Sequence, residues 1–177
     1  IDLLVKNQRP VQLLGTAGLG KTVIATNYLR GMDEKYLFTT INLNYYTDAS
    51  RLRATMEGPI DKRSGRTYGP PGTKKLVYFI DDLNMPYVDT YGTQSPSCLI
   101  RQHLDYKSWY NTSTLEKMEI QDVQYLACMN PTSGSFTIDD RLQGQFVALV
   151  TWSPTEKTLR SIYEQILTTH FIVYSKA

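Results

Sequence analysis

A short run near the start of the chain has the composition and spacing of a phosphate-binding loop. It matches the pattern G-x-x-x-x-G-K-[ST] and consists of Gly15-Thr16-Ala17-Gly18-Leu19-Gly20-Lys21-Thr22. Glycine allows positive φ angles and a close approach of the backbone to a ligand, so the loop amides can surround a phosphate chain. We expect Lys21 to place its charge at the β- and γ-phosphates and Thr22 to offer its hydroxyl to Mg²⁺. The run therefore predicts a site for a di- or triphosphate.

Polar side chains follow two other apolar runs, at the points where we expect strands to end. Asp81 and Asp82 end the run 75–82, and Asn130 follows the run 123–129. Continuous apolar runs predict strands buried on both faces of a parallel sheet, whose carboxyl ends meet at one edge. We assign Asp81 to Mg²⁺ through a water, Asp82 to polarising the attacking water, and Asn130 to a hydrogen bond with that water or the γ-phosphate. Ordinary strand-end turns before Pro86 and Pro131 are the structural alternative.

The elements around these residues favour the phosphate-loop interpretation over a glycine-rich helix cap. The apolar stretch 10–14 predicts a strand before the loop, and the stretch 23–30 predicts a helix that ends at Gly31. We expect further strands at 36–44 and 147–152, a loop at 131–135, an amphipathic helix from residue 155 onward, and helices at 2–7, 51–57 (with Ser50 as N-cap), 97–106 and 139–146. This order predicts an α/β fold of the P-loop NTPase class, with helices flanking a central parallel sheet.

Two segments between the expected core elements, 62–73 and 109–122, look like inserted hairpins or loops. The first is basic, and a nucleic-acid contact is one interpretation of it. Its only aromatic residue for base stacking is Tyr68, and the net charge of the chain is only +2. We therefore favour a solvated hairpin tip and expect no nucleic-acid partner.

The remaining residues with reactive side chains have simpler explanations. His103 has no partner at a metal-ligand spacing, and we expect it to pack against the core from one face of its helix. Cys98 and Cys128 also lack metal spacing, which predicts buried free thiols in a reducing compartment. No apolar run approaches the ~18 residues that span a bilayer, so we expect no membrane partner. We expect the chain of 177 residues to be a piece of a longer polypeptide with one α/β core.

The order of these motifs resembles the large subdomain of an AAA+ ATPase followed by the start of its helical lid. Several strings resemble more narrowly the third AAA+ module of axonemal dynein heavy chains, most of all the outer-arm class. They are Tyr68-Gly69-Pro70-Pro71-Gly72-Thr73-Lys74-Lys75, Phe79-Ile80-Asp81-Asp82-Leu83-Asn84-Met85-Pro86, Tyr91-Gly92-Thr93-Gln94, Ile100-Arg101-Gln102-His103-Leu104-Asp105-Tyr106 and Cys128-Met129-Asn130-Pro131-Thr132. The resemblance covers nearly the whole chain.

This resemblance implies a large αβα nucleotide-binding subdomain at residues 1–153 and the start of a helical lid at 154–177. It implies ATP or ADP with Mg²⁺ as ligands, Gly15 to Thr22 as Walker A, Asp81 with Asp82 as Walker B, and Asn130 as sensor I. A sensor II arginine would lie beyond the last residue.

The same resemblance implies a place in the motor ring of a ciliary or flagellar motor. Six such modules form the ring; the first carries the main ATPase cycle, and the third gates how that cycle reaches a microtubule-binding stalk. The implied partners are neighbouring AAA+ modules, a microtubule through that stalk, and the intermediate and light chains of the complex. The implied location is the axoneme, within the cytoskeleton of the cytoplasm.

Two departures from the family patterns bear on the chemistry. AAA+ hydrolases usually have Asp-Glu where this chain has Asp81-Asp82, and the shorter side chain sets the carboxylate back by about 1 Å. Because a misplacement of that size costs on the order of 100-fold in rate, we expect tight binding and slow hydrolysis. The family tends to have Asn-Pro-Arg-Leu-Gln-Arg-His-Phe at positions 139–146, where Arg141 is kept and the second arginine is replaced by Gly144. Arg141 is therefore the candidate arginine finger toward a neighbouring module.

Three functions stay open at this point. The first is a slowly hydrolysing regulatory module of a ciliary motor, and the second is a catalytically silent ring segment with permanently bound ADP. The third, an AAA+ machine that acts on nucleic acid, is favoured only by the basic loop near Arg63.

Overall fold

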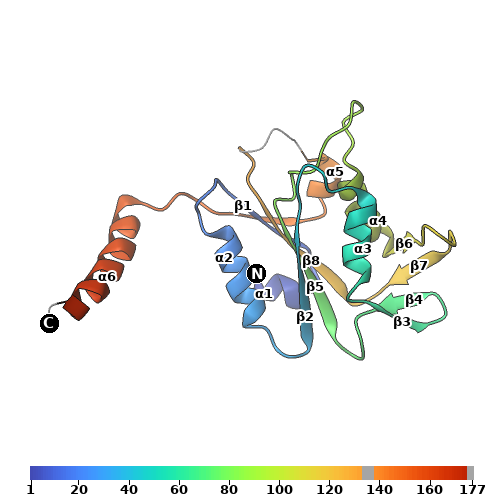
Figure 1. Cartoon of the computed structure of the whole chain (residues 1–177), viewed down its shortest axis with the longest axis horizontal. Coiled ribbons are helices and arrows are strands. Elements are labelled where there is room, and N and C mark those ends of the chain that lie inside the picture. Colours follow the sequence, from blue (N-terminus) through green and yellow to red (C-terminus); the bar gives the residue numbers. More distant parts are fainter. Residues whose placement is uncertain (133–137, 175–177) are drawn as a thin grey trace.

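The computed structural model describes residues 1–132 and 138–174 of the chain. Its centre is a five-stranded sheet in the order β2-β5-β8-β1-β9 (Figure 1). All four neighbouring pairs are parallel. The strands are β1 (Val11–Leu14), β2 (Tyr36–Asn42), β5 (Lys75–Asp81), β8 (Val123–Met129) and β9 (Val147–Val150). The predicted α/β fold with a central parallel sheet is confirmed.

Helices cover both faces of this sheet and create two hydrophobic cores. The first core lies under α1 (Asp2–Lys6) and α2 (Lys21–Arg30), and the second lies under α3 (Ala49–Glu57), α4 (Ser95–Tyr106) and α5 (Asp140–Gln143). Side chains along β5 alternate between them: Val77 and Phe79 join the first core, and Leu76, Tyr78 and Ile80 the second. Because both faces are buried, β5 is apolar from Leu76 to Ile80, and its charged residues, Lys75 and Asp81, lie only at its two ends.

A smaller sheet lies beside α3 and α4 and is built from the two predicted insertions (Figure 1). Its order is β3-β4-β7-β6, with β3 (Asp61–Ser64), β4 (Thr67–Gly69), β6 (Ser108–Tyr110) and β7 (Lys117–Ile120). Arg63 of the basic hairpin donates to the Pro70 carbonyl at 3.0 Å and pairs with Asp122 at 2.5 Å. The central cation of this segment therefore holds the insertion against the chain that leads into β8.

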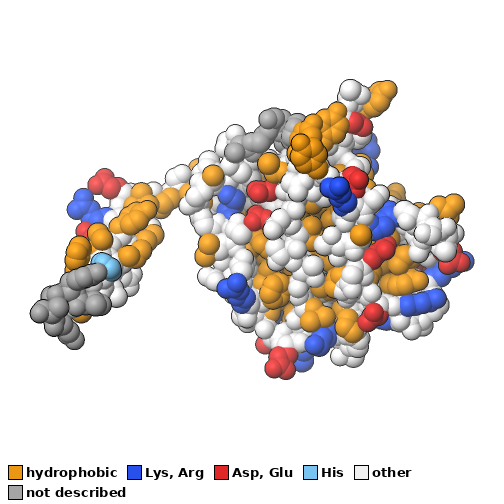
Figure 2. Space-filling model, viewed as in Figure 1, with side chains coloured by type: hydrophobic (Ala, Val, Ile, Leu, Met, Phe, Trp, Pro, Cys, Tyr) orange, Lys and Arg blue, Asp and Glu red, His pale blue; other side chains and the backbone are white. Residues whose placement is uncertain are grey.

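Helix α6 (Glu156–Tyr174) extends away from the rest of the chain after the connecting segment 151–155 (Figure 1). Its apolar side chains are exposed along its length, as the orange atoms over this helix in Figure 2 show. They include Leu159, Ile162, Tyr163, Ile166, Leu167, Phe171 and Ile172. The predicted amphipathic helix is present. Of the helices in the described ranges, none is both long enough and apolar enough to cross a membrane.

Several predicted boundaries were wrong. Helix α3 begins at Ala49, and its N-cap is Asp48, whose side chain accepts a hydrogen bond from the Arg51 amide at 2.7 Å; Ser50 lies inside the first turn. Helix α4 begins two residues earlier than expected, because Pro96 is favourable in a first turn. Strand β2 ends at Asn42, β9 ends at Val150, and α5 is shorter than predicted. Of the predicted loop 131–135, residues 133–135 lie outside the described residues.

Candidate functional site

The glycine-rich loop joins β1 to the first turn of α2 at the carboxyl edge of the main sheet. Gly18 and Gly20 have φ angles of +81° and +76°, a conformation that residues with a side chain rarely adopt. Gly20 is also the N-cap of α2, so the amides of the helix's first turn, which have no partner within the helix, begin at this point. A helix start of this geometry can bind an anion, and it lies at the position of the glycine-rich motif.

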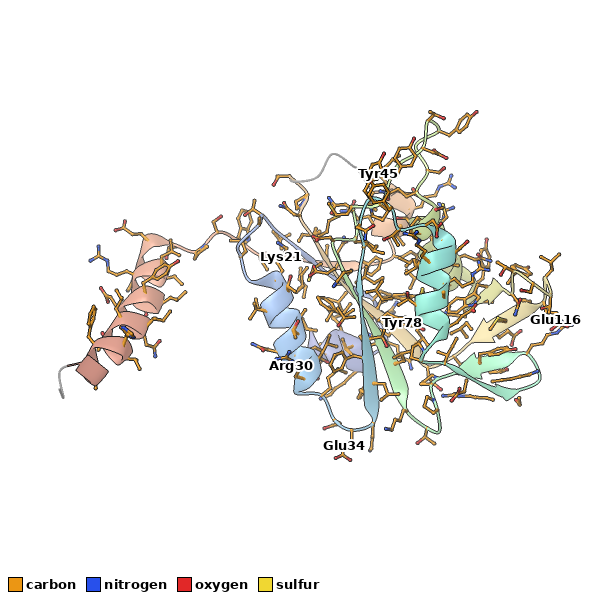
Figure 3. The ribbon with its side chains drawn as sticks, in the orientation of Figure 1. Lys21, Arg30, Glu34, Tyr45, Tyr78 and Glu116 are labelled. Atoms are coloured by element: carbon orange, nitrogen blue, oxygen red, sulfur yellow. The ribbon has the colours of Figure 1, made fainter. Side chains whose placement is uncertain are left out.

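Lys21 lies at the top of α2, beside the end of the sheet (Figure 3). Its side chain is buried, and its ammonium group donates hydrogen bonds to the carbonyls of Gly15 and Thr16 at 2.9 and 2.8 Å. A buried lysine is costly unless its charge is paired or solvated by polar groups. The loop carbonyls supply part of that solvation, and an anion in the loop would supply the rest.

The two acids at the end of β5 occupy different environments. Asp81 Oδ2 accepts a hydrogen bond from Thr22 Oγ1 at 3.0 Å, which joins the phosphate loop to the acidic strand end. Asp82 has a φ angle of +55°, a left-handed conformation that Asp tolerates better than most residues with a side chain. Burial raises the pKa of the Asp82 carboxyl, the charge of Asp81 raises it further, and Lys21 opposes both effects.

Asn130 follows β8, between the strands that lead to the acids and to the loop. Its Oδ1 atom accepts hydrogen bonds from the amide and hydroxyl of Thr132 at 3.1 and 3.0 Å. Its backbone carbonyl accepts a hydrogen bond from the buried Asn84 side chain at 3.0 Å. These contacts fix Asn130 and leave its amide nitrogen as the group that can donate to a ligand.

These residues share one pocket of about 450 Å³, a size suited to a small-molecule ligand. Its lining consists of Ala17, Gly18, Gly20, Lys21, Thr22, Val23, Asp81, Asp82, Met85 and Asn130. Within residues 1–132 and 138–174, no group of three or more His, Cys, Asp or Glu is placed to hold a metal by itself. Mg²⁺ commonly takes one or two protein ligands together with substrate phosphates and waters, and the hydroxyl–carboxylate pair of Thr22 and Asp81 fits that mode.

Comparison with known sequences identifies the family. Residues 1–154 match the family described as the P-loop containing dynein motor region. The chain belongs to this family. Membership implies the use of a nucleotide and Mg²⁺ and a place among P-loop ATPases.

The relatives of this dynein motor-region chain include heavy chains of cilia and flagella. It is 52% identical over 170 residues to "Dynein beta chain, ciliary" of Heliocidaris crassispina and 53% identical over 171 residues to "Dynein axonemal heavy chain 9" of Homo sapiens, matches that cover 96% of the chain in both cases. It is 45% identical over 172 residues, 97% of its length, to "Dynein beta chain, flagellar outer arm" of Chlamydomonas reinhardtii. The matched region is 4% of the length of each relative.

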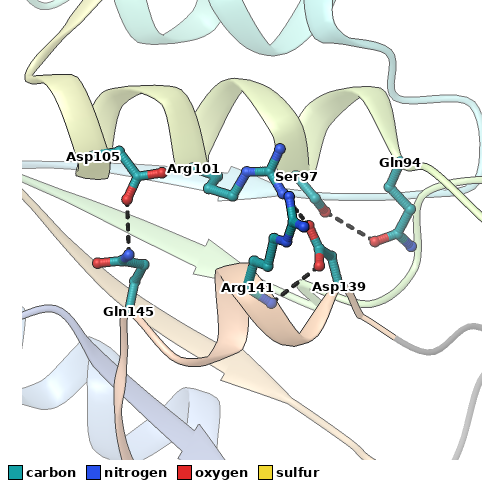
Figure 4. Close-up of polar contacts among 7 residues, drawn as sticks. All are labelled: Gln94, Ser97, Arg101, Asp105, Asp139, Arg141 and Gln145. Atoms are coloured by element: carbon teal, nitrogen blue, oxygen red, sulfur yellow. Dashed lines mark hydrogen bonds and ion pairs between the residues drawn. The ribbon is translucent and has the colours of Figure 1, made fainter.

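Arg141 does not line the phosphate pocket. It lies on α5, in a second pocket of about 530 Å³ between α4 and α5 (Figure 4). Two polar contacts hold α5 against α4: Arg101 pairs with Asp139 at 2.5 Å, and Gln145 donates to Asp105 at 2.8 Å. Asp139 also caps α5 through the Arg141 amide at 3.0 Å. Arg141 therefore lines a different pocket from the phosphate loop.

Three further residues were assigned from the sequence, and one buried residue near the site was missed. His103 packs in the core as expected. Cys128 is buried, and burial chiefly raises its pKa to about 12, but Cys98 is partly exposed, so its predicted burial was wrong. Helix α4 has only one face on the core, and Cys98 is at that face's margin in the Arg141 pocket. Sequence reasoning missed Asn84, although an amide two residues after the paired acids was a usable signal.

Proposed function

We propose that this dynein motor-region chain is the third AAA+ module of an axonemal heavy chain, a module that binds ATP, hydrolyses it slowly and regulates the motor. The observation that supports this most is the convergence of Lys21, Thr22, Asp81, Asp82 and Asn130 on one pocket. These residues lie in the first turn of α2, at the end of β5 and after β8, and a shared ligand accounts for their types together.

Each of these side chains has a distinct role in the proposed site. Lys21 binds the β- and γ-phosphates, while Thr22 and, through a water, Asp81 hold Mg²⁺. Bound Mg²⁺ neutralises the charge that develops on the phosphate oxygens. Asp82 orients the attacking water and accepts its proton, and Asn130 donates its amide N–H to that water or to a γ-phosphate oxygen.

The geometry at Asp82 supports slow turnover. Its left-handed backbone suits Asp better than a longer, unbranched side chain. Burial and the charge of Asp81 raise the pKa of the Asp82 carboxyl, but its reach is shorter than that of Glu. Positioning, more than basicity, would then limit the rate.

The ring assembly implied by the relatives' names gives the remaining parts of the proposal. Arg141 points to a neighbouring AAA+ module as an arginine finger, and the exposed apolar face of α6 belongs to a helical lid that begins near residue 154. The microtubule, reached through a stalk, and the intermediate and light chains are partners of the whole heavy chain. We place the protein in the axoneme of a cilium or flagellum.

A silent module that keeps ADP permanently is the second candidate, and the shortened carboxylate at Asp82 is what favours it. Both candidates need the same phosphate loop. They differ in whether added ATP exchanges into the site and whether its γ-phosphate is lost there.

The test is a photolabelling experiment on the full-length protein. The probe is an ATP analogue with a photoreactive azide on the adenine ring, radiolabelled at either the α- or the γ-phosphate, and the label is located by peptide mapping. We expect saturable labelling within residues 1–177, with γ-label lost slowly relative to α-label. Lys21→Ala should abolish it, while Lys35→Ala, an exposed lysine before β2, should not.

The other outcomes separate the candidates. No labelling, together with ADP released on acid denaturation from the parent but not from Lys21→Ala, would support the silent module. Equal labelling of the parent and Lys21→Ala would show that the loop is not the phosphate site.

A further inference from the structure

The two tryptophans of this chain have opposite surroundings. Trp109 is fully buried in the second core, whereas Trp152 is 85% exposed in the segment between β9 and α6. Tryptophan combines a large apolar ring with a polar N–H group, and an exposed tryptophan is therefore a side chain that a ligand or partner can cover. Which ligand or partner could contact Trp152 depends on where the segment between β9 and α6 lies.

Thr151, the residue before Trp152, is fixed against the phosphate loop. Its amide and its hydroxyl both donate to the Leu14 carbonyl, at 2.7 and 2.8 Å. A Cβ on Gly15 would lie 2.1 Å from Thr151 Oγ1 and 2.9 Å from the Thr151 carbonyl oxygen. The first residue of the phosphate loop must therefore be glycine for Thr151 to take this position, and Trp152 leaves the sheet directly beside the loop.

The order of the strands gives the site a direction. Asp81, Asp82 and Asn130 lie at the ends of β5 and β8, on one side of β1, and Thr151 lies after β9 on the other side. A phosphate chain whose terminal phosphate is at the acids has its nucleoside end on the opposite side. That side is the one on which Trp152 follows Thr151 in the chain, with its side chain exposed.

The phosphate pocket itself offers nothing for a purine ring to stack on. Its lining is glycine, polar side chains, Ala17, Val23 and Met85, without an aromatic residue among the described atoms. We propose that Trp152 is the stacking surface for the base of the bound nucleotide, and that the Thr151 contact with Gly15 and Leu14 positions it. This inference rests on the proposed nucleotide site and adds a recognition residue for the purine ring.

The expected effect follows from the strength of base stacking. Base–aromatic stacking contributes about 1–3 kcal/mol by alanine substitution, which corresponds to a loss in affinity of about 5- to 150-fold. Trp152→Ala should show this loss, and Trp152→Phe should recover most of it, because any aromatic face can stack. Binding of inorganic triphosphate, which has no base, should not change.

The experiment again uses the full-length protein and the adenine-azide analogue, which reacts with whatever lies against the base. We expect the adduct on Trp152 or its immediate neighbours, and labelling that saturates at about 5- to 150-fold higher concentration in Trp152→Ala. The matched control is Tyr91→Ala, an aromatic residue that is 90% exposed on a different loop. Inorganic triphosphate should compete equally well against labelling of the parent and of Trp152→Phe.

The outcomes distinguish the two proposals. Labelling that is lost in Lys21→Ala but identical in the parent and Trp152→Ala, with no adduct in residues 150–154, would overturn the role of Trp152 and leave the nucleotide site intact. If no nucleotide binds in a way that depends on Lys21, both the nucleotide site and the role of Trp152 are wrong. If the site holds ADP that does not exchange, the readout is ADP retained after gel filtration. Trp152→Ala should then lose it, Trp152→Phe and Tyr91→Ala should keep it, and equal retention in all variants would refute the inference.

Discussion

The phosphate pocket and the buried polar cluster on the other side of the sheet both collect polar side chains, but in different ways. The buried polar cluster consists of Tyr78, His103, Trp109 and Tyr125. In it, Tyr125 OH and His103 Nδ1 share a hydrogen bond of 2.6 Å, Trp109 donates to Glu57 at 3.0 Å, and Tyr78 donates to the Met56 carbonyl. These four polar groups thus find partners inside the protein, whereas the buried His103 Nε2 has no hydrogen-bond partner among the described residues. The rings pack edge to face at 5.3 to 5.5 Å around His103.

The pKa shifts of the buried polar cluster and of the phosphate pocket do not follow their expected functions. Burial lowers the pKa of His103 to about 4, with the charge of Lys107 adding to the effect, and burial raises the pKa of Tyr125 well above its ordinary value. The pKa of Asp82 in the phosphate pocket is also raised, but this residue is exposed. Strong pKa perturbation here marks packing, whereas the candidate site is marked by converging side chains around a pocket.

The largest predicted effect is on hydrolysis and tests the role of the phosphate pocket. Asp82→Asn should reduce the rate of γ-label loss from the site by about 100- to 10,000-fold, because the group that accepts the proton of water is removed. Binding should stay within a few-fold, since Asn has nearly the same shape. The measurement is the ratio of γ- to α-label over time, with Asp61→Asn on exposed β3 as control. A variant that loses binding as completely as Lys21→Ala would make Asp82 a binding group.

The second effect is a pH dependence of stability that comes from His103 in the buried polar cluster. The folded-state pKa of His103 is about 4 and its ordinary value is 6.5, so between these pH values the unfolded state binds the extra proton. The free energy of local unfolding should therefore fall by about 1.4 kcal/mol per pH unit as pH drops below 6.5, or about 2 kcal/mol by pH 5. Hydrogen exchange of β8 and α4 peptides in the full-length protein measures this.

The matched variant for that measurement is His103→Gln, which is neutral at every pH and keeps an acceptor. Its exchange should be flatter between pH 6.5 and pH 5 than the parent's, whatever its absolute stability. Equal pH slopes in the two proteins would show that His103 is protonated in the folded state.

The smallest effect tests whether the buried polar cluster is independent of the phosphate pocket. Tyr125→Phe removes the hydroxyl that pairs with His103 Nδ1 and should destabilise β8 by about 1–2 kcal/mol, since a buried polar atom loses its partner. Azide labelling of the nucleotide site should be unchanged. The same exchange and labelling measurements report both quantities, and altered labelling would mean that the cluster is coupled to the phosphate pocket through β8.

The parts of the fold that were predicted correctly depend on local chemistry. The glycine pattern, the apolar runs of β5 and β8 and the amphipathic α6 each follow from residue types within a few positions. The boundary at Ser50 was predicted incorrectly because Asp48 and Ser50 are both good N-caps, and the backbone path out of β2 selects between them. Cys98 was assigned wrongly because exposure depends on which face of α4 meets the sheet.

The sequence by itself determined which groups could handle a phosphate chain, because the spacing of glycine, lysine and threonine fixes their relative positions along a single turn. It also determined that acids would end a buried strand. Only the tertiary structure decided that Asp81 meets Thr22, that Arg141 lies away from the phosphate pocket, and that Thr151 contacts Gly15. Those contacts join residues far apart in the chain, and the order of strands in the sheet, which no local pattern encodes, brings them together.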